Sequence, residues 1–309
     1  PTFAGRSGPV LIVVADGVGV AEDSASNAVT QAETPTLDKL LSSQLSTSLA
    51  AHGTAVGLPT DDDMGNSEVG HNAIGAGRIF AQGAKLVNKA LETKTIYDSD
   101  VWKEAIKHGI AGTLHFIGLH SDGNVHSHID HLHQMISQAV VEGVNSICVH
   151  VLLDGRDTPP RSALDYLEKT EAFIETVNNA SDVNVRIASG GGRMTITMDR
   201  YEADWDMVQR GYDCHAHGVG RAFNSAKTAV ETLYSETDLG DQYLEPFVIT
   251  DAEGEPVGKI LDGDSIIFFN FRGDRAIEIS QAFEQAEFTV FDRGNHPNVF
   301  FAGMLQYDG

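Results

Sequence analysis

Five arginines follow apolar, strand-like runs in this sequence. Arg156 follows "SICVHVLL", Arg193 and Arg200 follow "VNVRIAS", and Arg272 and Arg275 follow "SIIFFNF". Parallel strands deliver their carboxyl ends to one edge of a sheet, where α/β proteins bind ligands, so these side chains are expected to meet there. Planar guanidinium groups bind phosphate or carboxylate through paired, charge-assisted hydrogen bonds. The pattern predicts a site for a small anion with two charged ends.

Acidic residues also stand at the ends of these runs. Asp16 ends "PVLIVVADG", which reads as a strand buried on both faces, and Asp157 follows Arg156 directly. A turn role for Asp16 stays open, since Asp-Gly is a common turn dipeptide, and any single arginine could instead form a surface ion pair. The three glycines before Arg193 are expected to let the backbone approach a ligand closely, although they lack the lysine of a P-loop.

One serine stands among glycines and acids in "TDDDMGNSEVGHNAIGAG", residues 60–77. Ser67 does not belong to a Gly-x-Ser-x-Gly elbow, because Val69 replaces the second glycine. It could cap a helix, which is a common role for serine. It could instead share a divalent metal with Asp16. The metal would lower the pKa of the hydroxyl and make it a nucleophile, beside a helix N-terminus that favours phosphate.

The elements that must position these residues alternate along the chain. A further strand is expected at "TLHFIGL", and apolar residues recur at helical spacing after Pro35, from Ile129 and from Leu164. A pattern from Ser162 to Asp165 predicts the cap of the last of these helices. Strands alternating with amphipathic helices predict an α/β fold with a mostly parallel sheet.

Composition limits the class of protein. A chain of 309 residues is long enough for two domains, and its net charge of −23 argues against nucleic acid or an anionic membrane as a partner. The two cysteines, Cys148 and Cys214, are too few for a disulfide framework, and the apolar run at Val10–Ala15 is too short to span a membrane. A cytoplasmic protein is therefore expected. The sequence contains no apolar stripe typical of a subunit interface, so a monomer is predicted.

Five motifs occur in order along the chain and resemble those of one family. They are "HGTAVGLPTDDDMGNSEVGHNAIGAGR", "SDGNVHSHIDHL", "LLDGRDTPP", "SGGGRMTITMDRYEADW" and "FNFRGDRAIE". The sequence resembles the cofactor-independent (2,3-bisphosphoglycerate-independent) phosphoglycerate mutases from "LIVVADGVG" to its end. The resemblance implies a partial alkaline-phosphatase-like domain with an inserted α/β transferase domain. It also implies interconversion of 3-phosphoglycerate and 2-phosphoglycerate through a phosphoserine, without bisphosphoglycerate.

Site residues follow from the resemblance by motif. Ser67 becomes the phosphorylated nucleophile, and Asp16 and Ser67 become ligands of two divalent metal ions, manganese or magnesium. Asp157 is predicted to exchange protons with the glycerate hydroxyls, because a carboxylate flanked by arginines stays ionised close to them. The substrate contacts implied are His126, Arg156, Asp157, Arg193, Arg200, Arg272 and Arg275.

The sequence also departs from the family pattern, whose remaining metal ligands and phosphate-binding lysine lie beyond "MLQYDG". The chain is therefore expected to be the amino-terminal portion of a mutase and to have negligible turnover alone. The expected parts are residues 1–80 of the phosphatase-like domain, residues 81–303 of the transferase domain, and residues 304–309 of a return linker. Two alternatives remain: another metal-dependent phosphatase or phosphomutase of the superfamily, and a non-catalytic phosphoglycerate-binding module.

Overall fold

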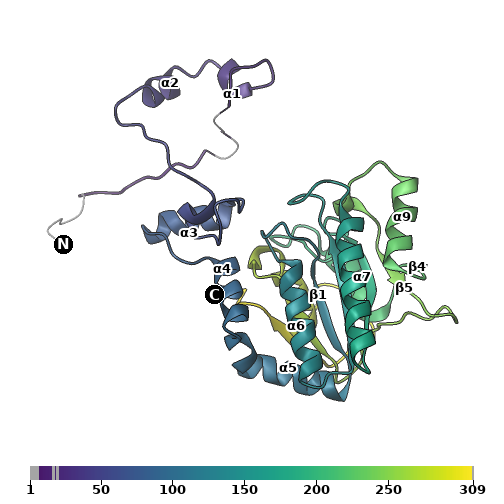
Figure 1. Cartoon of the computed structure of the whole chain (residues 1–309). Helices are drawn as coiled ribbons and strands as arrows, with labels where there is room; N and C mark the ends of the chain where they lie inside the picture. The colour runs from purple at the N-terminus through teal and green to yellow at the C-terminus, as the bar shows by residue number, and fades with distance from the viewer. Residues whose placement is uncertain (1–6, 16–17, 19–20, 308–309) are drawn as a thin grey trace. The chain divides into compact units, whose positions relative to one another are not determined.

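The computed structural model describes residues 7–15, 18 and 21–307. The chain divides into two compact units, residues 1–50 and residues 51–309 (Figure 1). The larger unit contains the sheet, the arginines of interest and Ser67. The domain boundaries implied by the resemblance stay a prediction.

The smaller unit contains two short helices, α1 (Ala28–Gln31) and α2 (Pro35–Leu41). The helix expected after Pro35 is confirmed as α2, with proline at its first position, where its missing N–H has no helical acceptor to lose. The strand expected at residues 9–15 is wrong. These residues form neither helix nor strand, and Leu11 is 84 % exposed. A strand buried on both faces needs a neighbouring strand and covering side chains, and the described sheet does not include this run.

Within the described residues, seven strands form one sheet in the order β4-β5-β3-β2-β1-β6-β7. Neighbouring strands are parallel except β3 and β5, which are antiparallel. Four of the five strands predicted from sequence are confirmed as the central β1, β2, β3 and β6. The strands are β1 (Leu114–Leu119), β2 (Ser146–Leu153), β3 (Asn184–Gly192), β4 (Arg221–Phe223), β5 (Phe247–Ile249), β6 (Ser265–Phe268) and β7 (Phe300–Gly303). The predicted α/β fold with a mostly parallel sheet is confirmed.

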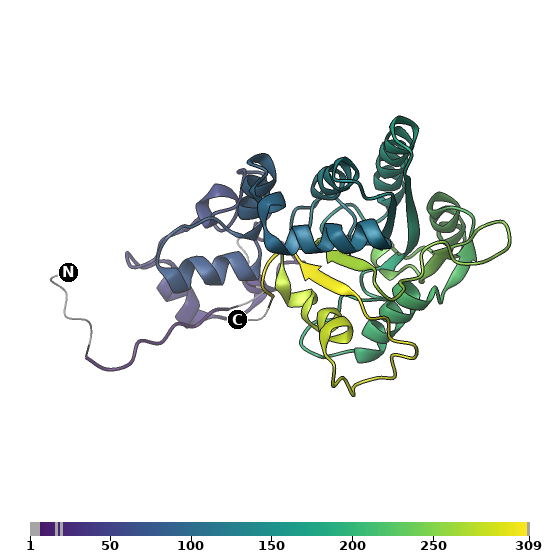
Figure 2. The same ribbon diagram turned by 90° about the horizontal axis from the view of Figure 1, so that it is seen from below.

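Helices cover both faces of this sheet, as Figure 2 shows. Those that pack on one face are α4 (Gly83–Glu92), α5 (Asp100–Ala111), α6 (Ile129–Val141), α7 (Ala163–Ala180) and α9 (Ala226–Glu236). Those on the other face are α8 (Trp205–Tyr212), η3 (Asp213–His217) and α10 (Ile277–Glu284). The remaining elements are α3 (Ser67–Ala76), η1 (Gly53–Val56), η2 (Thr95–Asp98), η4 (Asp241–Tyr243) and η5 (Gly273–Arg275). The helices predicted from Ile129 and Leu164 are confirmed as α6 and α7.

Successive side chains of each strand point to opposite faces, so each central strand contributes to two cores. In β1, Phe116 packs in the core under α5 and α6, whereas Ile117 packs in the core under α8 and α10. Both side chains are fully buried. This double burial explains why the strands read in the sequence as continuous apolar runs.

The cap predicted for α7 is replaced by a more distant one. Ser162 is the N-cap residue, but its hydroxyl donates to the Pro159 carbonyl instead of capping the helix. The Asp241 carboxylate takes that role, because its Oδ2 accepts from the backbone N–H groups of Ser162 and Ala163 at 2.8 and 2.9 Å. The capping prediction located the start of the helix and missed the side chain that stabilises it.

Asp264 ties the starts of two neighbouring strands together and is expected to make stability sensitive to acid. Its oxygens accept from the N–H groups of Thr113 and Leu261 at 2.7 and 2.8 Å. Burial pushes the Asp264 pKa upward, but the hydrogen bonds from His115 and from these two N–H groups outweigh it and lower the pKa below its ordinary value. The stabilisation is therefore complete above about pH 4, the unfolded pKa, and is lost as the pH falls through the folded-state pKa.

Replacing Asp264 with asparagine is expected to lower the free energy of unfolding at pH 7 by about 1.5–3 kcal/mol, since one N–H group then faces an amide donor. The variant should also lose less stability than the wild type between pH 7 and pH 3. Urea unfolding at both pH values measures this. Asp182→Asn, at an exposed position, serves as the control and should follow the wild type. Equal acid sensitivity of Asp264→Asn and the wild type would contradict the assignment.

Candidate active site

Ser67 begins α3, and its side chain is exposed at the helix N-terminus. Asn66 is the N-cap, since its carboxamide oxygen accepts from the Val69 N–H at 3.2 Å. The alternative interpretation of Ser67 as a helix cap is therefore wrong. Because the first N–H groups of a helix carry the positive end of its dipole, an anionic group brought to Ser67 would be stabilised there.

His71 lies one turn along α3 and contacts Ser67 twice. His71 Nδ1 is 2.7 Å from the Ser67 carbonyl oxygen and 3.3 Å from the Ser67 hydroxyl. A carbonyl oxygen can only accept, so the shorter contact requires the proton to be on Nδ1. In this arrangement Nδ1 has no free lone pair for the hydroxyl proton. His71 therefore does not act as the general base of Ser67 through this nitrogen.

Arginines surround the buried His126 ring. His126 is 3 % exposed, and its Nδ1 lies 3.9 Å from Asp274 Oδ1. Burial holds the pKa of His126 well below its ordinary value, and the positive charge of nearby guanidinium groups lowers it further. In decreasing order of effect those groups belong to Arg193, Arg272, Arg275 and Arg156. His126 is therefore neutral at pH 7, and four of the five predicted arginines lie near it.

Arg193 is the most deeply placed of these arginines, with 1 % of its surface exposed. Its Nη1 donates to Asp154 Oδ1 at 2.8 Å and to Asp157 Oδ2 at 2.5 Å. Asp154 also accepts from the Ser121 hydroxyl and from the backbone N–H groups of Arg156 and Asp157. The buried Asp154 carboxylate thus fixes both the turn after β2 and the guanidinium group of Arg193, which follows β3.

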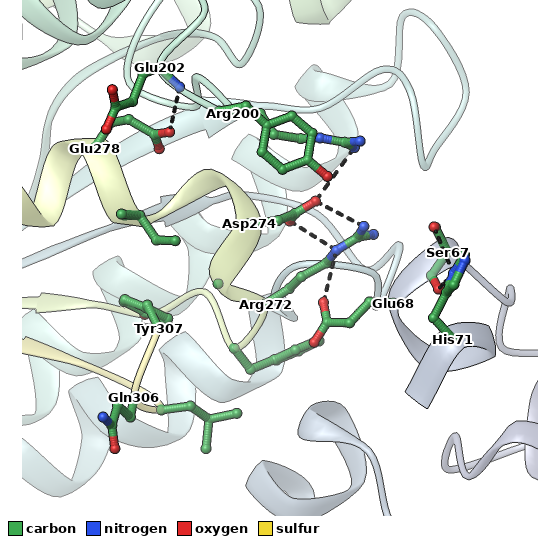
Figure 3. Close-up of a pocket in the computed structure, with 15 residues that line it drawn as sticks. Ser67, Glu68, His71, Arg200, Glu202, Arg272, Asp274, Glu278, Gln306 and Tyr307 are labelled. Carbon is green, nitrogen blue, oxygen red and sulfur yellow. Dashed lines mark hydrogen bonds and ion pairs between the residues drawn. The ribbon is translucent and has the colours of Figure 1, made fainter. Parts of the chain in front are cut away.

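Asp274 pairs with two arginines, Arg272 after β6 and Arg200 after β3. Arg272 forms a two-point ion pair with it, with Nε 2.9 Å from Oδ1 and Nη2 2.9 Å from Oδ2. Arg200 Nη1 lies 3.6 Å from Oδ2 of the same carboxylate (Figure 3). Arg275 instead donates from Nη1 to the Met198 carbonyl at 2.8 Å. Burial first, and then the charge of Arg193, lowers the Arg275 pKa.

A cleft of about 730 Å³ opens beside Asp274, between α3 and the side chains of Arg200 and Arg272. Its lining includes Ser67, His71, Arg200, Arg272 and Tyr307. Glu68, the residue after Ser67, reaches from α3 to Arg272, whose Nε lies 3.1 Å from Glu68 Oε2 (Figure 3). Burial raises the pKa of Glu68, although the positive charge of Arg272 opposes that shift. An anion that binds Arg272 therefore competes with Glu68.

Of the predicted site residues, most lie near His126, Arg200 lines the cleft, and Asp16 is not described. Arg193, Arg272 and Arg275 gather around His126 with Asp157, which is held by Arg193. Arg156 contributes its charge to the same cluster, although its side chain is exposed, and Arg200 lines the cleft. Asp16 lies outside the described residues, so its pairing with Ser67 stays a prediction.

The glycines of residues 190–192 pack against protein, and the expectation that they admit a ligand is wrong. A Cβ on Gly190 would lie 2.5 Å from the Phe247 ring, and one on Gly192 would lie 2.4 Å from the Gln242 backbone. Side chains are excluded here because β5 and the η4 segment lie against β3. The glycines place Arg193 by allowing this close packing.

Three carboxylates of the site were missed from the sequence: Glu68, Asp154 and Asp274. Asp154 follows "SICVHVLL" directly, which is the same position that made Asp16 a candidate. Asp274 stands between Arg272 and Arg275 in "FRGDR". A signal was therefore present in both cases, namely an acid beside the arginines that need a counter-charge once they are buried.

The described residues do not by themselves fit a divalent metal centre. In residues 7–15, 18 and 21–307, no three His, Cys, Asp or Glu side chains lie close enough to hold an ion. Of the two predicted ligands, only the Ser67 hydroxyl is described, and a single hydroxyl oxygen is not a ligand set for Mg²⁺ or Mn²⁺. The metal ligands therefore stay a prediction.

A family model described as the BPG-independent PGAM N-terminus matches residues 87–309, which contain the sheet and all five arginines. The chain belongs to this family. A probable 2,3-bisphosphoglycerate-independent phosphoglycerate mutase of Leptospira interrogans is 55 % identical over 98 % of the chain and 56 % of its own length. The 2,3-bisphosphoglycerate-independent phosphoglycerate mutase of Zea mays is 49 % identical over 97 % of the chain and 54 % of its own length.

A solved structure supports the same family membership. The phosphoglycerate mutase of Leishmania mexicana, crystallised at low cobalt concentration, matches 96 % of this chain and 55 % of its own chain. The TM-score is 0.90 at 44 % identity. The chain thus spans about half the length of the relatives that it matches. Among the described helices, none is both long and apolar enough to cross a membrane.

Proposed function

We propose that this chain binds 3-phosphoglycerate and 2-phosphoglycerate as part of a cofactor-independent phosphoglycerate mutase. The gathering of arginines around His126, in a protein of net charge −23, carries the proposal. Such a concentration of positive charge has a large self-repulsion and desolvation cost, which an anion with two charged ends would offset. The two charged ends of phosphoglycerate suit two groups of guanidiniums, one near Arg193 and one near Arg272.

In the proposed reaction Ser67 is the nucleophile. Its hydroxyl oxygen forms a bond to phosphorus and loses its proton, the bond from phosphorus to the glycerate oxygen breaks, and that oxygen takes up a proton. Return of the phosphoryl group to the other glycerate hydroxyl gives the isomer and frees Ser67. Asp157 exchanges the protons of the glycerate hydroxyls, because Arg193 holds its carboxylate in the cluster at 2.5 Å.

The remaining parts of the proposal rest on the family. Two divalent metal ions, manganese or magnesium, would bind Asp16 and Ser67 and would supply positive charge to the transferred phosphoryl group. The chain would work in the cytoplasm as a monomer, with no nucleic-acid or membrane partner and no bisphosphoglycerate. Residues 1–80 would form part of a phosphatase-like domain and residues 81–303 an inserted transferase domain, with residues 304–309 leading back.

A second candidate function is binding without catalysis. The four arginines that act on His126 all lie within residues 51–307, whereas the described residues hold no group of three or more metal ligands. The isolated chain is therefore proposed to bind phosphoglycerate without metal and to show negligible turnover. A phosphatase or a sugar-phosphate mutase of the same superfamily would instead prefer other phosphate esters.

Replacing Arg272 with alanine is expected to weaken 3-phosphoglycerate binding by roughly 10- to 100-fold. The reason is the loss of charge-assisted hydrogen bonds, each worth about 1.5–3 kcal/mol, although in the wild type part of this free energy is used to displace Glu68 from Arg272. Isothermal titration calorimetry of the chain, with and without manganese, measures the change. Arg221→Ala is the control, since Arg221 lies exposed on β4 and pairs with Glu236.

Two results would contradict the proposal. One is unchanged 3-phosphoglycerate affinity in Arg272→Ala. The other is equal or tighter binding of glucose 6-phosphate by the wild type, which would favour the phosphomutase alternative.

A further inference from the structure

A continuous chain of hydrogen bonds crosses the buried face of the sheet that packs under α8 and η3. It begins at Asp264, just before β6, crosses β1, β2 and β3, passes through η3 and ends in the segment after β3 that carries Arg200. All its side chains are 5 % exposed or less. Its members are, in order, Asp264, His115, His150, Ser189, His215 and Thr197.

The carboxylate at one end determines the proton positions of the first two rings. Asp264 can only accept, so the 3.2 Å contact places a proton on His115 Nε2. A neutral His115 then accepts at Nδ1, and the 3.0 Å contact there places a proton on His150 Nε2. His150 Nδ1 is left as the acceptor.

The same reasoning determines the proton positions in the remaining hydrogen bonds. Ser189 donates its hydroxyl proton to His150 Nδ1 at 2.7 Å, so its oxygen accepts from His215 Nδ1 at 3.0 Å. His215 Nε2 is then the acceptor for the Thr197 hydroxyl at 2.9 Å. With all three rings neutral, every hydrogen bond therefore points toward Asp264. Burial lowers the pKa of His215 to about 3 and also lowers those of His115 and His150, in agreement with neutral rings.

Thr197, at the far end, has a conformation that its side chain does not favour. Its φ is 68°, in the left-handed region where a β-branched residue is an outlier. The next residue, Met198, presents its carbonyl to Arg275 Nη1 at 2.8 Å. Arg200 follows and reaches Asp274. The direction of the backbone at Thr197 thus determines where Arg275, near His126, and Arg200, in the cleft, find their partners.

We propose that the buried series of hydrogen bonds from Asp264 to Thr197 positions the arginines that lie near His126 and in the cleft. The Thr197 hydroxyl, fixed by His215, holds the backbone in its left-handed conformation, and the Met198 carbonyl consequently meets the guanidinium of Arg275. An apolar side chain at position 197 or 215 could fill the core, but it could not fix the direction of the backbone at Thr197. The link to anion binding rests on the proposed function, whereas the proton positions and the link to Arg275 do not.

The first test is the protonation state of the three rings in the full chain at pH 7. Nitrogen-15 chemical shifts of histidine rings distinguish the two tautomers and the charged form. The expected result is a proton on Nε2 of His115 and His150 and on Nδ1 of His215. A different tautomer at any of the three rings, or a charged ring, overturns the proposal, whether or not the chain binds phosphoglycerate.

The second test compares two substitutions at one position. Thr197→Val keeps the shape and the branched Cβ but removes the hydroxyl, whereas Thr197→Ser keeps the hydroxyl. Thr197→Val should shift the Nε–H signal of Arg275 and weaken 3-phosphoglycerate binding about tenfold, and Thr197→Ser should stay within about threefold of the wild type. Thr176→Val, on the exposed side of α7, is the control for loss of a threonine hydroxyl and should match the wild type.

The outcomes separate the two proposals. An unshifted Arg275 signal in a folded Thr197→Val variant overturns the positioning role, as does equal loss of affinity in the valine and serine variants. If the wild type fails to bind 3-phosphoglycerate, the proposed function fails. The ring tautomers and the Arg275 signal then still test the positioning role, and an unexpected tautomer overturns it even if Thr197→Val does not fold.

Discussion

Replacing Arg193 with methionine is expected to lower the free energy of unfolding by about 3 kcal/mol and to abolish measurable 3-phosphoglycerate binding. The guanidinium lies between two carboxylates, Asp154 and Asp157, whose side chains are 2 % and 11 % exposed. Methionine fills a similar volume but leaves these carboxylates without a counter-charge. Two backbone N–H groups still satisfy Asp154, which places the expected loss at the lower end of the range for broken buried ion pairs.

The control is an ion pair of similar length on the surface. Arg221 lies 2.5 Å from Glu236, and both side chains are more than 40 % exposed. Arg221→Met should therefore change the free energy of unfolding by no more than about 1 kcal/mol. Urea unfolding at pH 7 measures both variants. Adding Asp157→Asn to Arg193→Met should recover part of the loss, because it removes one of the two uncompensated charges. An equal loss of unfolding free energy in Arg193→Met and Arg221→Met would mean that burial of the ion pair adds nothing to its contribution to stability.

Much of the fold could be predicted because the central strands are buried on both faces. Such strands are apolar at every position, as in "SICVHVLL", and they stand out from helices with polar faces. The short outer strands gave no such signal, since β4 has three residues and two of them are exposed. The run "PVLIVVA" carries the same signal as the central strands yet lies exposed. Apolar character shows that a segment can be buried, but pairing depends on the neighbours that the fold supplies.

The cations of the site could be predicted better than the anions that hold them. Strand ends share one edge of the sheet, so the position of an arginine after a strand is enough to place it. The partner of a buried arginine can come from any element that reaches this edge. Glu68 lies more than two hundred positions before Arg272, and Asp154 lies 39 before Arg193. Only the tertiary structure brings such pairs together.

The buried histidines illustrate the same limit. In the sequence, His115 and His150 are single polar residues within apolar runs, and nothing local relates them to Asp264. Their registers in β1 and β2 place them on one face of the sheet, where each ring supplies one donor and one acceptor. Strand register therefore creates a polar chain that no spacing rule predicts.

Replacing Ser67 with alanine is expected to abolish phosphoryl transfer in a full-length mutase that carries this chain, while leaving phosphoglycerate binding nearly unchanged. The hydroxyl is the only atom of the side chain that can bond to phosphorus, and its loss should lower kcat by roughly a million-fold, the scale seen when a nucleophilic enzyme loses its nucleophile. In the proposed function, binding depends on the guanidiniums around His126, which the substitution does not alter. A coupled assay gives kcat, and calorimetry gives the dissociation constant.

Ser137→Ala is the control, because Ser137 lies exposed on α6 and its hydroxyl donates only to the His133 carbonyl of the same helix. That variant should keep wild-type kcat and should still gain the mass of one phosphate on Ser67 when quenched during turnover. A Ser67→Ala enzyme with kcat within tenfold of the wild type would exclude a phosphoserine at this position. The arginine cluster would then hold the substrate for a direct transfer or for a nucleophile elsewhere, because its geometry does not depend on the Ser67 hydroxyl.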